Sequence, residues 1–176
     1  MNNITFIPFP ILSTEHFILR QLTPEDENEI FILRSDERIL KYLDRSPAKS
    51  IEEAKQFIEK VNNGIKENGS IYWVVSYKNE TKLVGTICLW NISKDQTKAD
   101  IGFELLPDFQ EKGIMQEVIP TVIDYGFNTM KLITIEGEVD PNNIKSIKLM
   151  EKFGFKYTCK LAQTDIYSLK NPAYPN

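Results

Sequence analysis

The sequence has few histidines, few cysteines and no surplus of basic charge, and each shortage excludes a class of function. Its 176 residues contain one histidine, His16, and two cysteines, Cys88 and Cys159. A histidine–cysteine metal cluster or a Cys-His catalytic pair is therefore poorly supported. Both cysteines lie among apolar, β-prone residues, so we expect them to be reduced and buried, which suits a cytoplasmic chain.

Basic residues do not outnumber acidic residues in this chain. Twenty-one Lys and Arg against 25 Asp and Glu give a formal net charge of −4. The chain therefore lacks the positive field on which most nucleic-acid binders rely, whereas a cationic partner such as an amine meets little repulsion. The apolar start, Met1–Leu12, carries no basic segment and is interrupted by Pro8 and Pro10, so we expect neither a signal peptide nor a membrane span.

The remaining composition, 41% hydrophobic and 26% charged, is typical of a globular protein. No repeat, low-complexity tract or linker divides the chain, so we expect one domain over residues 1–176. Periodicity predicts an α/β (α+β) mixed sheet with helices on its faces, in the order β-α-α-β-β-β-α-β-α-β-β. The predicted strands are 17–22, 71–77, 83–91, 99–106, 132–139, 155–160 and 165–169. The predicted helices are 24–34 with a short piece at 37–43, then 51–65, 113–130 and 143–153.

Local signals mark several helix ends. Thr23-Pro24 and the pattern from Ser50 to Glu53 are typical of helix starts, and Gly154 is typical of a residue that follows a helix. Pro120 lies inside the predicted helix 113–130, where it removes a hydrogen bond and should cause a kink.

The stretch 99–115 is the most informative part of the chain. A predicted strand ends at Pro107, a short polar loop follows, and a helix opens near Gly113. Free N–H groups at a helix N-terminus, together with the helix dipole, favour a bound phosphate, and Gly113 lets the backbone approach a ligand closely. An ordinary strand-to-helix turn is the alternative interpretation of the same pattern.

Further motifs follow in a fixed order along the chain. They are Thr14-Glu15-His16-Phe17-Ile18-Leu19-Arg20, Val84-Gly85-Thr86-Ile87, Gln110-x-x-Gly113, Asp140-Pro141-Asn142-Asn143, Ser146 and Glu151-Lys152-Phe153-Gly154-Phe155. Together they resemble the GNAT superfamily of acetyl-CoA-dependent N-acetyltransferases, and within it the RimJ/RimL-type branch, which includes ribosomal-protein N-terminal acetyltransferases. The resemblance covers about residues 13 to 170. It implies the GNAT acyl-CoA N-acyltransferase fold, with a central, mostly antiparallel mixed sheet flanked by helices.

The resemblance implies acetyl-CoA as cosubstrate and no metal. The strand 101–106 would splay from its neighbour, and the backbone of Leu105 and Leu106 would bond the pantetheine amides. The pyrophosphate would be held by backbone N–H groups, and Lys112 would add positive charge. These N–H groups belong to Gln110, Glu111, Lys112, Gly113, Ile114 and Met115. From the last helix, Asn143 would contact the cofactor arm, and Ser146 lies one turn further on the same face.

The implied reaction is direct attack of an amine on the thioester, without an acyl-enzyme. Asp100 and Glu104 lie on one face of the central strand and are the candidate bases, with a solvated or paired acid as the alternative for each. Glu136 and Glu138 are reserve candidates. Relatives often carry Tyr where this chain has Met150, so the catalytic acid would be Ser146. A serine that caps or braces its helix is the alternative.

One departure from the family pattern favours a rival hypothesis. Met115 replaces the usual Gly or Ala, which would place a long side chain beside the cofactor pocket. With the missing Tyr at Met150, this keeps open a catalytically silent acyl-CoA-binding or regulatory module. A generic nucleotide binder is a third hypothesis. The sequence does not decide whether the acceptor is a protein N-terminus or a small polyamine-like or drug-like amine. It also does not decide whether the protein forms a homodimer.

Other conspicuous residues receive ordinary structural interpretations. His16 is expected to be exposed and inert, and the acidic run Glu25–Glu27 to serve a helix N-terminus. Lys145 and Lys148 are expected on a solvated helix face, with contact to the adenosine phosphate as the alternative. Four aromatic residues are expected to pack on the sheet, although some of them would suit an acceptor pocket; they are Tyr72, Trp73, Trp90 and Phe103.

Overall fold

The computed structural model describes residues 4–174, so the first three and last two residues of the predicted domain lie outside it. The strands are β1 (Leu12–Ser13), β2 (Phe17–Gln21), β3 (Ile71–Tyr77), β4 (Gly85–Trp90), β5 (Lys98–Leu105), β6 (Thr134–Val139), β7 (Lys156–Leu161) and β8 (Thr164–Lys170). The α-helices are α1 (Glu27–Ser35), α2 (Glu37–Leu40), α3 (Ile51–Lys66), α4 (Ile114–Asp124) and α5 (Ile144–Lys152). A 3-10 turn at Pro24–Asp26 precedes α1, another lies at Pro107–Phe109, and a π-helical turn at Tyr125–Thr129 extends α4.

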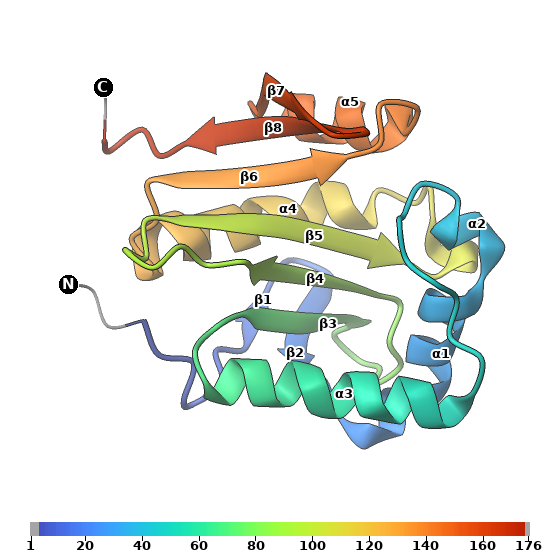
Figure 1. Ribbon diagram of the computed structural model, residues 1–176. Coiled ribbons are helices and arrows are strands. Elements are labelled where there is room, and N and C mark those ends of the chain that lie inside the picture. The colour runs from blue at the N-terminus through green and yellow to red at the C-terminus, as the bar shows by residue number, and fades with distance from the viewer. Residues whose placement is uncertain (1–3, 175–176) are drawn as a thin grey trace.

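The strands form one mixed sheet in the order β1-β2-β3-β4-β5-β6-β8-β7 (Figure 1). Every neighbouring pair is antiparallel except β5 and β6, which run parallel because α4 connects them across the sheet. The predicted mixed, mostly antiparallel sheet is therefore confirmed.

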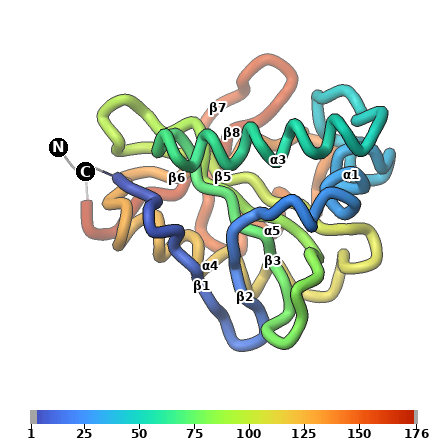
Figure 2. Tube along the Cα trace, turned by 90° about the horizontal axis from the view of Figure 1, so that it is seen from below, coloured from blue at the N-terminus to red at the C-terminus, as the bar shows by residue number. Residues whose placement is uncertain are grey.

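Helices cover both faces of this sheet (Figure 2). The larger core lies beneath α4 and α5, where the buried side chains of Trp73, Ile87 and Val118 pack together. A smaller core lies between α1, α3 and the opposite face, around Leu33, Ile58 and other apolar residues. Because side chains alternate along a strand, β3 contributes Trp73 to the first core and Val74 to the second.

The two predicted helix starts are present, and additional side chains form hydrogen bonds there. The Ser50 hydroxyl accepts from the backbone N–H of Glu53 at 3.4 Å and caps α3. The carboxylate of Asp26 accepts from the backbone N–H of Thr23 at 2.9 Å. Asp26 is also buried against both terminal nitrogens of Arg20, at 2.9 and 2.7 Å, so this acid is a structural ion pair as well as part of a helix start.

The fourth helix continues across Pro120 and widens only afterwards. Pro120 is exposed within α4, and the π-helical turn begins at Tyr125. Tyr125 packs edge-on against Trp73, with ring centroids 5.3 Å apart. The end of α4 is thereby fixed to the middle of the sheet.

Several expectations about single residues were wrong. Cys159 is exposed, because every side chain of the edge strand β7 is open to solvent, and Cys88 is only half-buried; both thiols are free. His16 is exposed as expected, but it is not inert: its Nδ1 lies 2.9 Å from Oε2 of Glu117 on α4. That contact joins the β1–β2 turn to α4.

Within residues 4–174, no helix is long and apolar enough to span a membrane. The same residues contain no cluster of three or more metal-ligating side chains.

Candidate active site

The central strands β5 and β6 separate halfway along their length. They pair only from Lys98, Ala99 and Asp100 to Thr134–Glu136, although β5 continues to Leu105 and β6 to Val139. The expected splay is therefore present, and it leaves the far half of β5 with an unpaired backbone edge.

The free edge of β5 belongs to alternate residues. Leu106 donates its amide to the carbonyl of Val84 at 3.0 Å, on the side of β4. By the alternation of a strand, Phe103 and Leu105 direct their backbone groups to the gap beside β6. The Leu105 carbonyl accepts from the side-chain amide of Gln110 at 3.3 Å. A movable side chain thus occupies the position where an extended ligand would donate.

The loop after β5 ends in the exposed N-terminus of α4. Glu111 and Gly113 have φ of 61° and 75°, and Gly113 is the N-cap residue. The Gly113 carbonyl accepts from the Glu117 N–H at 3.3 Å, so the N–H groups before residue 117 have no helical acceptor. They form a set of donors suited to phosphate oxygens.

The side chain of Met115 does not stand beside this loop. Met115 and Ile114 are both buried, and they pack in the core beneath α4. The expected obstruction is wrong, because the helix turns both side chains inward and presents only their backbone to the loop.

Charged side chains surround the loop. Glu111 forms an ion pair with Lys145 of α5. The Lys112 ammonium lies 5.3 Å from the centroid of the Phe109 ring. The Glu111–Lys145 ion pair therefore connects the loop before α4 to the first turn of α5.

The start of α5 brings Asn143 and Ser146 together. Asn143 is the N-cap residue, and its Oδ1 accepts from the backbone N–H of Ser146 at 3.3 Å. Ser146 is half-buried, and within residues 4–174 its hydroxyl has no hydrogen-bond partner. Met150 is buried beneath Gly137, where a Cβ on that glycine would lie 2.5 Å from the Met150 sulfur. The methionine is therefore part of the core.

On the face opposite α4, β5 presents Asp100 and Glu104 in different surroundings. Asp100 is half-buried and accepts from the Asn91 side chain at 2.8 Å. Burial is the main cause that raises its pKa, and the nearby Glu136 raises it further. Glu104 accepts from Arg45 at 2.6 Å; burial raises its pKa, against the opposing effect of Arg45. Asp100 is therefore the better placed to exchange a proton.

The neighbouring strands add two more carboxylates to this face. Glu136 lies opposite Asp100 and forms an ion pair with Lys98 at 2.9 Å. Glu138 accepts from the Thr164 hydroxyl at 2.5 Å. The reserve candidates thus lie on the same face as Asp100, but they have partners of their own.

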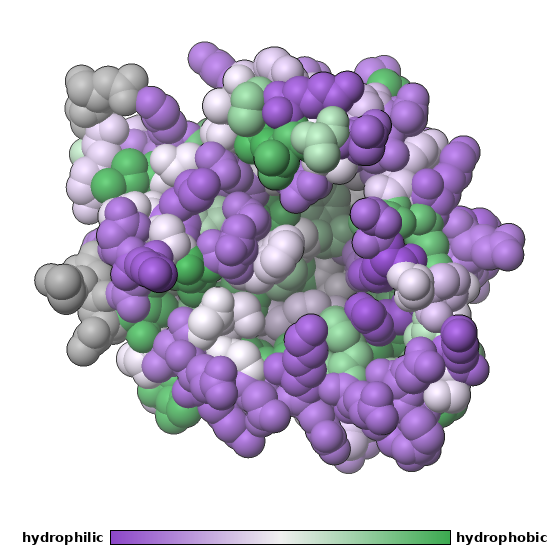
Figure 3. All heavy atoms as spheres, viewed as in Figure 1, coloured by the Kyte–Doolittle hydropathy of each residue, from purple (hydrophilic) through white to green (hydrophobic). Residues whose placement is uncertain are grey.

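This face is hollowed in the space-filling view (Figure 3). We call it the front groove and define it by six residues of β4, β5 and β6: Cys88, Trp90, Asp100, Gly102, Glu104 and Glu136. Trp90 is 47% exposed, and a Cβ on Gly102 would lie 3.7 Å from its indole nitrogen. Burial raises the pKa of the Cys88 thiol to about 12, so it stays protonated at neutral pH. Trp90 departs from the expected sheet packing, whereas Trp73 is fully buried.

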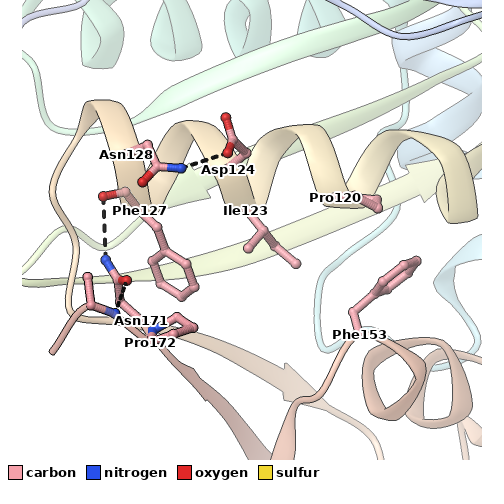
Figure 4. A pocket seen from close by; sticks show the side chains of 9 residues that line it. Pro120, Ile123, Asp124, Phe127, Asn128, Phe153, Asn171 and Pro172 are labelled. Atoms are coloured by element: carbon pink, nitrogen blue, oxygen red, sulfur yellow. Dashed lines mark hydrogen bonds between the residues drawn. The ribbon is translucent and has the colours of Figure 1, made fainter. Parts of the chain in front are cut away.

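A cavity of about 530 Å³ lies elsewhere, between α4 and the C-terminal segment (Figure 4). It is lined by residues such as Pro120, Phe127, Phe153 and Pro172. None of the predicted site residues lines it, so it is separate from the loop, the β5 edge and the front groove.

Sequence reasoning missed the partners that distinguish these carboxylates. Arg45 lies in the loop between α2 and α3, and Asn91 lies just after β4. Neither residue belongs to a periodic pattern or to one of the quoted motifs. Only the alternation of β5 could have indicated that Phe103 shares the free edge with Leu105.

Known proteins with similar sequences and structures identify the family of this chain. A family model described as an acetyltransferase (GNAT) domain matches residues 16–156. YoaA of Bacillus subtilis (strain 168), named as an uncharacterized N-acetyltransferase, is 32% identical over 174 residues, which cover 93% of this chain and 98% of YoaA. The structure of spermidine N-acetyltransferase from Vibrio cholerae, in complex with CoA and spermine, has a TM-score of 0.77 and 25% identity, covering 88% of this chain and 95% of that one. RimJ of Mycobacterium smegmatis, in complex with CoA-disulfide, has a TM-score of 0.82, covers 94% of this chain and 89% of that one, and at 14% identity shows the fold alone.

Proposed function

The chain belongs to the GNAT family of acetyltransferases, and on that premise we propose that it moves an acetyl group from acetyl-CoA to a primary amine. The observation that carries the proposal is the separation of β5 from β6 directly before the exposed N-terminus of α4. An unpaired strand edge suits the amide groups of pantetheine, and the helix N-terminus suits the pyrophosphate. One extended ligand, acetyl-CoA, would satisfy both.

The proposed seat of acetyl-CoA uses backbone groups more than side chains. Phe103 and Leu105 offer the edge that pantetheine would pair with, and the Gln110 side chain would leave the Leu105 carbonyl. The amide of Leu106 is already bonded to Val84, so it has the weaker claim of the two leucines. The N–H groups of residues 111–115 would hold the pyrophosphate, with Lys112 adding charge. The Gln110 N–H already donates to the Pro107 carbonyl at 3.3 Å, so it has a weaker claim.

Two residues of α5 complete the proposed seat. Asn143 uses its side-chain oxygen to cap the helix, which leaves its amide nitrogen for the cofactor arm. The Ser146 hydroxyl faces no partner within the described chain and would donate to the sulfur of the departing thiolate.

In the proposed reaction the free amine attacks the thioester carbonyl carbon. A carbon–nitrogen bond forms and the carbon–sulfur bond breaks, so the electron pair leaves with sulfur. Before the attack the acceptor ammonium gives one proton to the Asp100 carboxylate. As the amide forms, the nitrogen loses a second proton, which reaches the departing thiolate through the Ser146 hydroxyl or through water. Asp100 is chosen over Glu104 because Glu104 is held by Arg45.

The acceptor is proposed as an amine that enters through the front groove. Exposed Trp90 and the carboxylates of Asp100 and Glu136 are groups that attract cations. The neighbour named as a spermidine N-acetyltransferase favours a small amine. The motifs that resemble the RimJ/RimL-type branch keep a protein N-terminus as the alternative acceptor. A single domain, a homodimer and a cytoplasmic location stay predictions.

The silent-module alternative is not favoured. Its first motive, Met115 in the cofactor pocket, is removed because that side chain is buried in the core. Its second, Met150 in place of Tyr, leaves Ser146 available.

Thiol release tests the proposed function. Purified protein is incubated with acetyl-CoA and a panel of amines and peptides, and free CoA is measured against acceptor-free controls. We expect release above background with at least one amine. Acetyl-CoA that stabilises the protein while no acceptor releases CoA would revive the silent module; no stabilisation at saturating acetyl-CoA would overturn both.

A further inference from the structure

Two arginines lie near Glu104 at the end of the front groove, and one of them, Arg45, contacts it. Arg45 donates through Nη2 to Oε1 of Glu104 at 2.6 Å and to the carbonyl of Leu33 at 2.9 Å. Arg34, in the last turn of α1, is coupled electrostatically to both Arg45 and Glu104. Glu104 forms an ion pair with Arg45, and Glu53 acts on Arg34 only weakly through its charge, so within residues 4–174 no carboxylate contacts the Arg34 guanidinium.

The guanidinium of Arg34 has no acidic partner of its own. It is half-buried, and its central carbon lies 3.9 Å from the centroid of the Phe57 ring. Within residues 4–174 the guanidinium forms no ion pair and no hydrogen bond. Burial, and next the charge of Arg45, lower its pKa, which shows that the surroundings disfavour the cation. Stacking on Phe57 fixes the plane of the group and leaves its N–H edges unused.

Arg45 adds a second unused donor in the same place. Its Nε is buried and has no hydrogen-bond partner, although Nη2 is fully engaged. A buried donor without a partner is costly, and a half-buried cation without a counter-ion is costly too. The acids of the groove do not relieve either, because Asp100 is bonded to Asn91 and Glu136 to Lys98. Glu53 acts on Arg34 through charge but forms no ion pair with it. A ligand that brings an anionic group would supply the missing partner of the Arg34 guanidinium and a counter-charge beside Arg45.

We propose that Arg34, with Arg45 beside it, is an anion subsite of the front groove, and that the acceptor carries a carboxylate in addition to its amine. The inference rests on the proposed function, and it narrows the acceptor to an amino-acid-like or acidic peptide amine. A guanidinium edge matches the two oxygens of a carboxylate.

The layout of β5 supports an acceptor with both charges. Asp100 and Glu104 lie on one face, four residues or about 13 Å apart along the strand. The Asp100 end is acidic and the Glu104 end carries the two arginines. An amine held between them, at the thioester, would have its carboxylate directed to Arg34. A polyamine has no anionic group that could bind Arg34.

Matched acceptor pairs test the subsite. Each pair differs by one carboxylate: Ala-Asp amide with Ala-Asn amide, and 4-aminobutanoate with butylamine. We expect kcat/KM to favour the anionic member of at least one pair by about tenfold, as a charge-assisted hydrogen bond typically provides. Polyamines or neutral members preferred throughout would overturn the subsite while leaving the proposed function standing.

Arginine variants separate recognition from structure. In Arg34→Gln, KM for the anionic member should rise about tenfold, and the preference for the anionic over the neutral member should disappear. Arg34→Lys should recover part of the preference, because it keeps the charge and loses the fork. Arg38→Gln is the matched control, since Arg38 is exposed on α2 and pairs with Asp36. Equal loss for both members in Arg34→Gln would assign Arg34 a purely structural role.

Direct binding keeps the subsite testable if no acceptor is turned over. N-acetyl-Ala-Asp amide and N-acetyl-Ala-Asn amide, which are the reaction products of one pair, are titrated calorimetrically into the CoA-bound protein. We expect tighter binding of the aspartyl compound in the wild type and no difference in Arg34→Gln. Equal binding of the two compounds to the wild type would overturn the subsite independently of activity.

Discussion

Asp100 and Glu104 show how far a strand pattern determines the role of a residue. Alternation along β5 places both carboxylates on one face, and the structure agrees. The pattern could not separate them, because the difference comes from Asn91 and Arg45, which approach from other parts of the chain. The sequence therefore limits the candidates for the general base to one face of β5, and the tertiary contacts distinguish the two carboxylates.

Replacing Asp100 by Asn should remove the proposed base. We expect kcat to fall about 100-fold, the typical minimum contribution of a general base. Because the pKa of Asp100 is raised, the wild-type rate should fall as the pH drops through that raised value, where the carboxylate takes up its proton. The variant should lack this acidic limb when rate is measured against pH with one fixed acceptor.

Glu104→Gln provides the comparison for the same strand face. It removes the partner of Arg45 and should change KM for the acceptor, while the acidic limb of the rate profile remains. An acidic limb lost in Glu104→Gln and kept in Asp100→Asn would exchange the roles of the two carboxylates.

His16 makes stability depend on pH. The hydrogen bond with Glu117, followed by the charge of Glu117, raises the pKa of His16. Its stabilisation is therefore complete below the unfolded pKa and is lost as the pH rises through the higher folded value. We expect Tm of the wild type to exceed that of His16→Gln by more at about pH 5.5 than at about pH 8.5. A difference independent of pH would remove the charge of His16 from the explanation.

At the scale of elements, the sequence predicts regular segments well and irregular ones poorly. Strand β3 has the expected bounds, and Gly154 ends α5 with a φ of 89°. The two-residue strand β1 and the π-helical turn Tyr125–Thr129 were missed. A two-residue strand has no measurable period, and a single wide turn is defined by its backbone hydrogen bonds, which a side-chain pattern does not report.

The N-cap glycine of α4 offers a test at this scale. Gly113 has a φ of 75°, and a Cβ there would meet nothing within 4 Å, so the cost of Gly113→Ala is backbone strain alone. We expect a loss of about 1 kcal/mol in the free energy of unfolding, measured by urea denaturation. Acetyl-CoA affinity should fall as well, because the loop before α4 would shift.

Gly69→Ala is the matched control for that substitution. Gly69 lies in a turn without positive φ, and its added Cβ would make an ordinary contact of 3.7 Å with the Gly64 carbonyl. It should leave acetyl-CoA affinity unchanged. Equal losses of stability and affinity in both variants would show that the left-handed backbone at Gly113 is not the cause.

For the molecule as a whole, the central feature is a charge conflict between the chain and its proposed cosubstrate. The net charge of −4 opposes the approach of phosphate groups. Attraction must come from backbone N–H groups and from the lysines beside the loop, and one of these, Lys145, is paired with Glu111. Composition reveals the conflict, but only the fold shows that α5 brings Lys145 to the loop.

Glu111→Gln should therefore tighten acetyl-CoA binding. The change removes a carboxylate from the loop that would hold the pyrophosphate and releases Lys145. We expect Kd to fall about threefold at low ionic strength, with a smaller gain at about 0.5 M salt because exposed charges are screened. Glu80→Gln, in the turn between β3 and β4, makes the same change in net charge far from the loop and should leave Kd constant. An equal gain in both variants would attribute the effect to overall charge, and weaker binding in Glu111→Gln would mean that the ion pair positions the loop for the phosphates.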